Sequence, residues 1–287
     1  MNTSFNHAQF EDPRDLIHRL DQEGLMPLKA GLLSRASQVL QGHQRGAVVS
    51  KELQLLVDRI HSDPDVERAR ARLKGMLRYL FEGGNYHADV VQLDHLVGKN
   101  VLNDGDMLVD LGTGSGEVVK QWAARGNPAI GVDASPSFVA GNELIRLGLI
   151  DDELRHLRAI LPELAGMKRA FILSSLTLDR VSDPEEFVNN VGKLAGPEGD
   201  FAIASLFPLN PVDDEQKIKL KKRIHYTPSH LRIATSGNEF EDLANTMQLI
   251  ERITGREVEE SQVPYIVHTA NGPQVYPNYH MITTKKR

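Results

Sequence analysis

The sequence predicts an α/β fold in which a doubly wound, mostly parallel sheet follows a region made only of helices. Before about Asn103, apolar residues recur every three or four positions, which is typical of amphipathic helices. After Asn103, short continuous apolar runs alternate with helical stretches, and this alternation indicates a parallel sheet covered on both faces. A glycine-rich turn follows the first of these runs, at the edge where open α/β sheets bind their ligands.

The N-terminal region is predicted to contain about five helices and no strand. Pro13 follows two acidic residues, as at many helix starts, and the next helix carries Leu28 and Leu32 within a run of apolar residues at helical spacing. The expected helices cover residues 13–20, 27–40, 50–60, 64–81 and 88–97. We expect residues 1–102 to form a helical cap or lid and residues 103–287 to form the ligand-binding α/β domain.

The α/β region is predicted to contain several short strands. The strand-like runs cover residues 108–111, 129–132, 170–173, 200–207, 263–268 and 280–284. An Asn-Gly turn signal lies between the last two runs, so we expect them to pair as an antiparallel hairpin at the edge of the sheet. A helix is expected to begin near Ser182, which forms a capping box with Glu185 three residues later.

The composition excludes several classes of function. The net charge of −6 gives no basic footprint for nucleic acid, and we interpret the basic run at residues 217–223 as a solvated helix face. The absence of cysteine excludes disulfides and thiolate chemistry, and it fits a cytoplasmic location. No apolar run approaches about 18 residues and the N-terminus lacks the pattern of a signal peptide, so we expect no membrane span and no secretory leader.

The glycine-rich turn has a spacing that indicates the type of ligand. Gly112, Gly114 and Gly116 are spaced G-x-G-x-G, and glycine lets the backbone turn tightly and approach a ligand. A dinucleotide fingerprint reads G-x-G-x-x-G and places a pyrophosphate at the helix N-terminus, whereas here the helix opens with Glu117, whose carboxylate opposes a pyrophosphate. Asp133 ends the second strand, where an acid can bind both ribose hydroxyls. These residues favour a cationic or zwitterionic nucleoside.

The run DLGTGSGE, followed by GVDAS, resembles the cofactor motifs of the class I S-adenosylmethionine-dependent methyltransferases. The resemblance implies the Rossmann-like fold of that class, with S-adenosylmethionine as the methyl donor or as the substrate itself. It implies that the glycine loop lines the methionine and ribose parts, that Asp133 binds the ribose, and that Ala134 and a loop around Ala159 lie beside the adenine. The cofactor-binding residues carried over in this way are Asp110, Gly112, Thr113, Gly114, Gly116, Asp133, Ala134, Ala159, Ile160 and Ser174.

The reaction centre is predicted at the carboxyl ends of the fourth and fifth strands. Ser174 and Ser175 end the fourth strand and Ser205 lies on the fifth, so we expect all three near the ligand crevice. Tyr86 is a further candidate, because a glycine pair just before it is typical of a lid hinge and an aromatic face can stabilise a sulfonium. We predict Ser175, Ser205 and Tyr86 as catalytic residues.

The sequence offers weaker candidates for a general base and for pocket walls. These are His87, His268, His280, Tyr79, Tyr265, Tyr276, Tyr279 and Asp179, and each is more often a packing, capping or surface residue. The stretch SSLT after the fourth strand lacks the clustered carboxylates of metal-dependent catechol-type methyltransferases and the Asn/Asp-Pro-Pro-Tyr motif that clamps a flipped base. No histidine pair has zinc spacing. We therefore expect no metal and no nucleic-acid substrate.

Several functions are compatible with these residues. The first is methyl transfer to an oxygen or nitrogen nucleophile of a small molecule in specialised metabolism. The second is the reaction of the azetidine-2-carboxylate synthases, which resemble this fold: the α-amine of S-adenosylmethionine attacks its own γ-carbon, and methylthioadenosine leaves. The helical cap and the polar, non-acidic ends of the fourth and fifth strands fit both reactions.

Two further hypotheses have features against them. The intact glycine loop and Asp133 argue against a non-catalytic S-adenosylmethionine-binding regulator, and Glu117 argues against an NAD-dependent oxidoreductase. As partners we expect a small-molecule substrate and neither nucleic acid nor membrane, and the sequence leaves a homodimer open.

Overall fold

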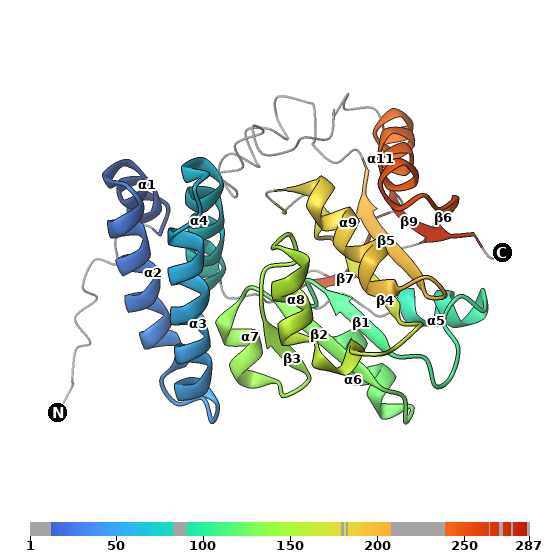
Figure 1. The fold of residues 1–287 in the computed structure, drawn as a ribbon, viewed down its shortest axis with the longest axis horizontal. Helices are drawn as coiled ribbons and strands as arrows, with labels where there is room; N and C mark the ends of the chain where they lie inside the picture. Colours follow the sequence, from blue (N-terminus) through green and yellow to red (C-terminus); the bar gives the residue numbers. More distant parts are fainter. Residues whose placement is uncertain are drawn as a thin grey trace. The chain divides into compact units, whose positions relative to one another are not determined.

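The computed structural model describes residues 13–82, 91–178, 181, 183–207, 239–263, 265–269, 272–276 and 278–285. The chain divides into two compact units, Met1–Gly83 and Gly84–Arg287 (Figure 1). Three of the candidates from the sequence, Tyr86, His87 and Asp179, and the basic run 217–223 lie outside the described residues.

The described part of the first unit consists of helices, as the sequence predicts. They are α1 (Pro13–Glu23), α2 (Leu25–Leu40), α3 (Gly46–His61) and α4 (Val66–Glu82). Helix α2 packs against the other three, and its buried face carries Leu28, Leu32 and Ala36. The apolar spacing read from the sequence therefore marks the core of this unit.

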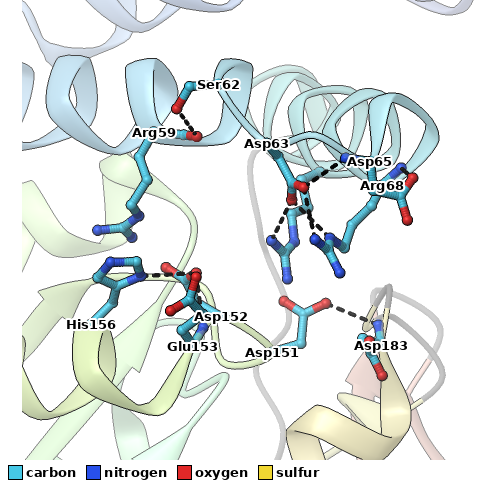
Figure 2. Close-up of polar contacts among 11 residues, drawn as sticks. Arg59, Ser62, Asp63, Asp65, Arg68, Asp151, Asp152, Glu153, His156 and Asp183 are labelled. Atoms are coloured by element: carbon cyan, nitrogen blue, oxygen red, sulfur yellow. Dashed lines mark hydrogen bonds and ion pairs between the residues drawn. The ribbon is translucent and has the colours of Figure 1, made fainter.

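An ion-pair network holds the turn between α3 and α4. Asp63 accepts hydrogen bonds from Arg68 Nε and Nη2, both at 2.7 Å, and from the backbone N–H of Asp65 at 3.0 Å (Figure 2). Arg72 Nη1 lies 3.4 Å from the same carboxylate. The bond from Arg68 is the main reason that the pKa of Asp63 lies below its ordinary value. This network fixes the direction in which α4 leaves α3.

The second unit is built on a seven-stranded sheet with the order β3-β2-β1-β4-β5-β9-β6. Its strands are β1 (Leu108–Leu111), β2 (Ala129–Asp133), β3 (Ile145–Leu147), β4 (Phe171–Ser175), β5 (Asp200–Leu206), β6 (Val258–Gln262) and β9 (Tyr279–Thr284). Strands β1 to β5 pair in parallel, and β9 is antiparallel to both β5 and β6. The predicted doubly wound, mostly parallel sheet, preceded by a helical region, is confirmed.

Helices cover both faces of this sheet. They are α5 (Val91–Gly98), α6 (Glu117–Ala124), α7 (Pro136–Gly141), α8 (Leu154–Ile160), the short 3₁₀ helix η1 (Pro162–Leu164), α9 (Pro184–Ala195) and α11 (Glu239–Thr254). One apolar cluster joins α8, α9 and α11 to the face that carries Val109 and Ile172. A second cluster joins α5 and α6 to the opposite face, around Leu108 and Leu173. We refer to these as the α9 face and the α6 face.

Helix α5 belongs to the core of the second unit. Its residues Leu93 and Leu96 lie in the same apolar cluster as Trp122 of α6. The two compact units thus divide at Gly83, before α5 begins. That residues 1–102 act as a cap or lid stays a prediction.

The predicted hairpin between residues 263–268 and 280–284 is wrong. Strand β7 (Tyr265–Thr269) pairs instead with β8 (Gly272–Tyr276), which the sequence analysis did not identify, and the two form a separate two-stranded sheet. Strand β9 is buried along its whole length between β5 and β6. The Asn-Gly signal lies in the sequence at the start of β8, and β9 lies inside the main sheet, where every one of its residues is buried.

The predicted capping box at α9 is wrong by one position. Asp183 is the N-cap residue, and its carboxylate accepts the backbone N–H of Glu186 at 3.1 Å. Pro184 follows at the first helical position, where its missing N–H has no consequence. No helix among the described residues is both long and apolar enough to cross a membrane.

Candidate functional site

The strand order places a topological switch point at the carboxyl ends of β1 and β4. The chain runs outward from β1 through β2 to β3 and then returns to the other side of β1 as β4. The connections after β1 and β4 therefore leave the sheet in opposite directions, and ligands of open α/β sheets bind at such a switch point. The glycine loop follows β1, and Ser174 and Ser175 end β4 on the neighbouring strand.

The glycine loop depends on backbone angles that only glycine adopts without strain. The φ angles of Gly112, Gly114 and Gly116 are +81°, +57° and +78°, all in the left-handed region. The N–H groups of Gly112 and Thr113 both donate to the carbonyl oxygen of Val132, at 2.8 and 3.1 Å. The loop is thus tied to the end of β2, and Gly116 forms the N-cap of α6.

We refer to residues 112–116 and Asp133 together as the cradle. Asp133 holds the glycine loop from the tip of β2. Its Oδ2 accepts the N–H of Gly114 at 2.8 Å, and its Oδ1 accepts the N–H of Ser135 at 2.7 Å. These two bonds hold the Asp133 carboxylate in one orientation at the tip of β2. Ala134 follows Asp133 and is half-buried. That it lies beside the adenine stays a prediction.

Asp110 is a buried carboxyl group beneath the glycine loop. Its side chain is only 3% exposed. Burial is the main cause that raises the pKa of Asp110 to about 7, and the nearby negative charge of Asp133 raises it further. The Thr113 hydroxyl lies close enough to oppose this rise, although the two side chains do not reach the geometry of a regular hydrogen bond. Near neutral pH, the charge of this site can therefore change by one proton.

The turn after β4 packs directly against the glycine loop. Ser174 Oγ donates to the carbonyl oxygen of Leu111 at 2.8 Å and shares a hydrogen bond of 2.9 Å with Thr177 Oγ1. A β-carbon at Gly112 would collide with the Thr177 methyl group. Leu176, between the two hydroxyl residues, has φ +55°, a strained value for a residue with a side chain. Because Gly112 has no side chain and the turn takes this strained conformation, the turn after β4 packs directly against the glycine loop.

The predicted catalytic serines lie on opposite faces of the sheet. Ser175 is on the α6 face together with Asp110, because Asp110 pairs with Leu173, two residues before Ser175. Ser205 is buried on the α9 face, where it pairs with His280 of β9. Ser175 therefore lies on the same face of the sheet as Asp110, and Ser205 lies on the opposite face.

His280 is a structural residue in this arrangement and not a general base. It is 4% exposed. Its Nδ1 lies 2.7 Å from Glu260 of β6, and its Nε2 lies 2.8 Å from Glu239 at the start of α11. With both ring nitrogens bound to carboxylates, His280 has no lone pair directed at a substrate. Its two bonds connect β9 to β6 and to α11 on the α9 face.

The predicted adenine-flanking residues belong to a helix and not to a loop. Ala159 and Ile160 form the last turn of α8, where Ala159 is exposed and the Ile160 side chain packs closely over Gly148. The segment that directly follows β3 is 148–153. The roles predicted for Ala159 and Ile160 thus stay predictions.

Two buried acids in segment 148–153 were missed by the sequence analysis. Asp151 Oδ2 accepts the N–H of Asp183 at 3.1 Å, and Asp152 Oδ1 accepts the N–H of Glu153 at 2.9 Å and contacts His156 Nδ1 at 3.2 Å (Figure 2). The side chain of Asn190 holds the same segment from α9, with bonds to two of its carbonyl oxygens. Two adjacent acids directly after the apolar stretch 147–150 were the signal for this anchored loop.

Part of the second unit matches a family model. Residues 109–203, which include the glycine loop, Asp133 and the turn after β4, match the model described as "Methyltransferase domain". The unit has the class I methyltransferase fold. No curated protein sequence matches the chain significantly.

Solved methyltransferases are similar to this chain at low identity. One is described as a candidate methyltransferase of an antibiotic biosynthesis pathway from Anabaena variabilis, with 14% identity over 61% of this chain and 65% of that one, and a TM-score of 0.43. The present chain thus spans slightly less than two thirds of that protein. Another is a TehB-like S-adenosylmethionine-dependent methyltransferase from Corynebacterium glutamicum, with 13% identity over 73% and 94% of the two chains, and a TM-score of 0.42.

A third similar structure contains a cofactor product. It is a phosphoethanolamine N-methyltransferase of Haemonchus contortus with phosphomonomethylethanolamine and S-adenosylhomocysteine, with 12% identity over 68% of this chain and 52% of that one, and a TM-score of 0.45. Identities and scores of this size carry no information on the substrate of the present chain. Within the part of the chain that the structure describes, no group of three or more acidic or histidine side chains is arranged to hold a metal ion.

The glycine loop yields a prediction about stability. Gly112→Ala should lower the free energy of unfolding of the second unit by about 2–4 kcal/mol, because it adds a collision with Thr177 to the strain of a left-handed backbone. Gly114→Ala is the matched control: its φ is also positive, but a β-carbon there meets nothing within 4 Å, so only about 1 kcal/mol should be lost.

The measurement is denaturant unfolding followed by the fluorescence of Trp122, the single tryptophan of the chain, which is buried in this unit. Equal losses for the two variants would show that the turn after β4 does not press on Gly112.

Proposed function

We propose that this chain is an S-adenosylmethionine-dependent transferase that methylates an oxygen or nitrogen nucleophile of a small molecule in specialised metabolism. One observation carries the proposal. The Gly114 N–H donates a hydrogen bond of 2.8 Å to Asp133, which joins the glycine loop to the acid at the end of β2. Both residues lie within the segment that matches the methyltransferase domain. The overall charge of −6 supports a small molecule over a nucleic acid as the acceptor.

The residues of the cradle fit S-adenosylmethionine. A β-carbon at Gly114 would enter open space, so the loop presents its backbone to a ligand at that position. Asp133 suits the two ribose hydroxyls, and the buried Asp110 suits the positive charges of the methionine part. Helix α6 begins with Glu117, and an acid in the first helical turn disfavours the pyrophosphate of a dinucleotide.

The protein's own contribution is binding, orientation and the exclusion of water. S-adenosylmethionine supplies a methyl carbon made electrophilic by the adjacent sulfonium. The glycine loop and Asp133 hold the nucleoside, while the turn after β4 brings Ser175 to the same face of the sheet as Asp110. Holding two reactants in line contributes on the order of 7–11 kcal/mol to such a reaction. A general base is not required for an amine that loses its proton before transfer.

The first test separates methyl transfer from the alternatives. The pure protein is incubated with S-adenosylmethionine alone, and the products are followed by mass spectrometry. We expect the compound to remain intact and bound, because methyl transfer needs an acceptor. Methylthioadenosine with azetidine-2-carboxylate, above the uncatalysed background, would instead establish cyclisation. If no acceptor then supports turnover, the chain is a binding regulator.

A second test concerns the binding site itself. Asp133→Ala should weaken binding of S-adenosylmethionine about a hundredfold or more, because two hydrogen bonds to a charged acceptor are lost. Isothermal titration calorimetry measures the affinity, and circular dichroism checks the fold. Asp94→Ala is the control, since Asp94 is an exposed residue that pairs with Arg125. An unchanged affinity in Asp133→Ala would contradict the assignment of the cradle.

A third test uses the protonation of Asp110. A cationic ligand favours the ionised carboxylate, so binding at pH 6 should release close to one proton, and affinity should rise up to tenfold per pH unit until the pH passes about 7. Calorimetry in two buffers with different ionisation enthalpies counts the protons. Asp110→Asn should remove both the release and this pH dependence. Proton release that persists in that variant would assign the effect to another group.

The same variant has a second expected effect, on the stability of the free protein. Because the folded state raises the pKa of Asp110 from 3.8 to about 7, its contribution to stability is complete below pH 3.8 and is lost as the pH rises through 7. At pH 8, Asp110→Asn should therefore unfold with a free energy roughly 3–5 kcal/mol higher than the parent protein.

A further inference from the structure

A pair of hydroxyl groups lies on the α6 face at the carboxyl end of β4. Ser175 Oγ and the Tyr279 hydroxyl share a hydrogen bond of 2.8 Å, although 104 positions separate them in the sequence. Tyr279 is fully buried, with 0% exposure, whereas Ser175 is half-buried. The more exposed member of the pair is therefore Ser175, which ends β4 beside the topological switch point.

The sheet register explains how this pair forms. Strand β5 lies between β4 and β9, and Ser175 pairs with Ala204 on it. Tyr279 pairs with Leu206, two residues further along the same strand, so both side chains are on one face. Because Ala204 has only a methyl side chain, the phenol of Tyr279 can reach across β5 to Ser175. A larger residue at position 204 would fill this path.

The pair lies close to the cradle and not at a remote surface. Leu176, the residue after Ser175, has the strained φ of +55°, and its N–H donates to the carbonyl oxygen of Ala204 at 2.8 Å. The next residue, Thr177, packs against Gly112 of the glycine loop. Strain of this kind persists only where the surroundings hold it, and it is frequent at functional sites. The turn thus aligns Ser175 with the loop that binds the nucleoside.

The other hydroxyl groups of this region have different surroundings. Ser174 points to the α9 face, where it donates to the carbonyl oxygen of Leu111 and bonds to Thr177. Ser205 is buried on the same α9 face. Of these three serines, only Ser175 is on the face of Asp110 and is partly accessible.

We propose that Ser175 contacts the group that S-adenosylmethionine transfers, and that Tyr279 is a positioning residue that orients the Ser175 hydroxyl toward it. This inference rests on the proposed function and extends it. An oxygen lone pair directed at the methyl group stabilises the positive charge next to the sulfonium, and it orients an acceptor that carries an N–H or O–H group. The bond to Tyr279 keeps this oxygen in one direction before the substrate arrives, so less conformational freedom is lost on binding.

The test compares two ligands that differ at the transferred group. Sinefungin carries a protonated amine where S-adenosylmethionine has its sulfonium methyl, and S-adenosylhomocysteine has no group there. Calorimetry measures both affinities for the parent protein and for Ser175→Ala, Tyr279→Phe and the double variant. Ser261→Ala is the matched control, because this serine on β6 also loses one side-chain bond, to Lys99 Nζ at 2.6 Å.

We expect Ser175→Ala to weaken sinefungin about tenfold and Tyr279→Phe about three- to fivefold, while S-adenosylhomocysteine changes less than twofold in both. The double variant should bind sinefungin no more weakly than Ser175→Ala, since Tyr279 acts through Ser175. Ser261→Ala should change neither ligand.

Three results would overturn the inference. If the variants bind both ligands more weakly by the same factor, the Ser175–Tyr279 pair has a structural role only. If the affinity for both ligands is unchanged, the pair does not contact the transferred group. If Tyr279→Phe and Ser175→Ala add fully in the double variant, Tyr279 does not act through Ser175. Binding of S-adenosylhomocysteine by the parent protein keeps these results separate from a failure of the proposed function, because a protein that binds neither ligand refutes both.

Discussion

The close approach of the glycine loop and the turn after β4 is the constraint on which the rest of the site depends. Gly112 has no side chain, so Thr177 can pack against the loop and the Ser174 hydroxyl can reach the carbonyl oxygen of Leu111. Two strands on either side of the topological switch point are thereby joined at their carboxyl ends. Without this contact, the residues after β1 and those after β4 would diverge, because their connections leave the sheet in opposite directions.

The second constraint is electrostatic. Asp110 and Asp133 place two carboxyl groups around one loop, and the structure resolves their repulsion by burying the first and giving the second two backbone N–H donors. Burial raises the pKa of Asp110 to about 7, and the negative charge of Asp133 raises it further. A site built this way gains most from a ligand that brings positive charge, which explains why a glycine loop with this acid pattern differs chemically from a dinucleotide loop.

The sequence was sufficient to predict the features that follow from local patterns. The apolar spacing of α2, the short buried strand β1, and the acid at the tip of β2 are each set by neighbouring residues, and all are present. The pairing of β9 could not be read in this way, because a strand between β5 and β6 is chosen by burial across the whole sheet. The same reason hid the Ser175–Tyr279 bond, which depends on a small residue at position 204 of a third strand.

The antiparallel strand β9 gives the second unit its asymmetry. Adjacent residues on a strand point to opposite faces, so Tyr279 meets Ser175 on the α6 face while His280 joins Glu260 and Glu239 on the α9 face. On one face of this strand Tyr279 contacts the end of β4, and on the other face His280 connects the strand to β6 and α11. A shift of β9 by one residue would exchange the two side chains and lose both sets of bonds at once, so the register of this last strand is fixed by polar groups as well as by apolar burial.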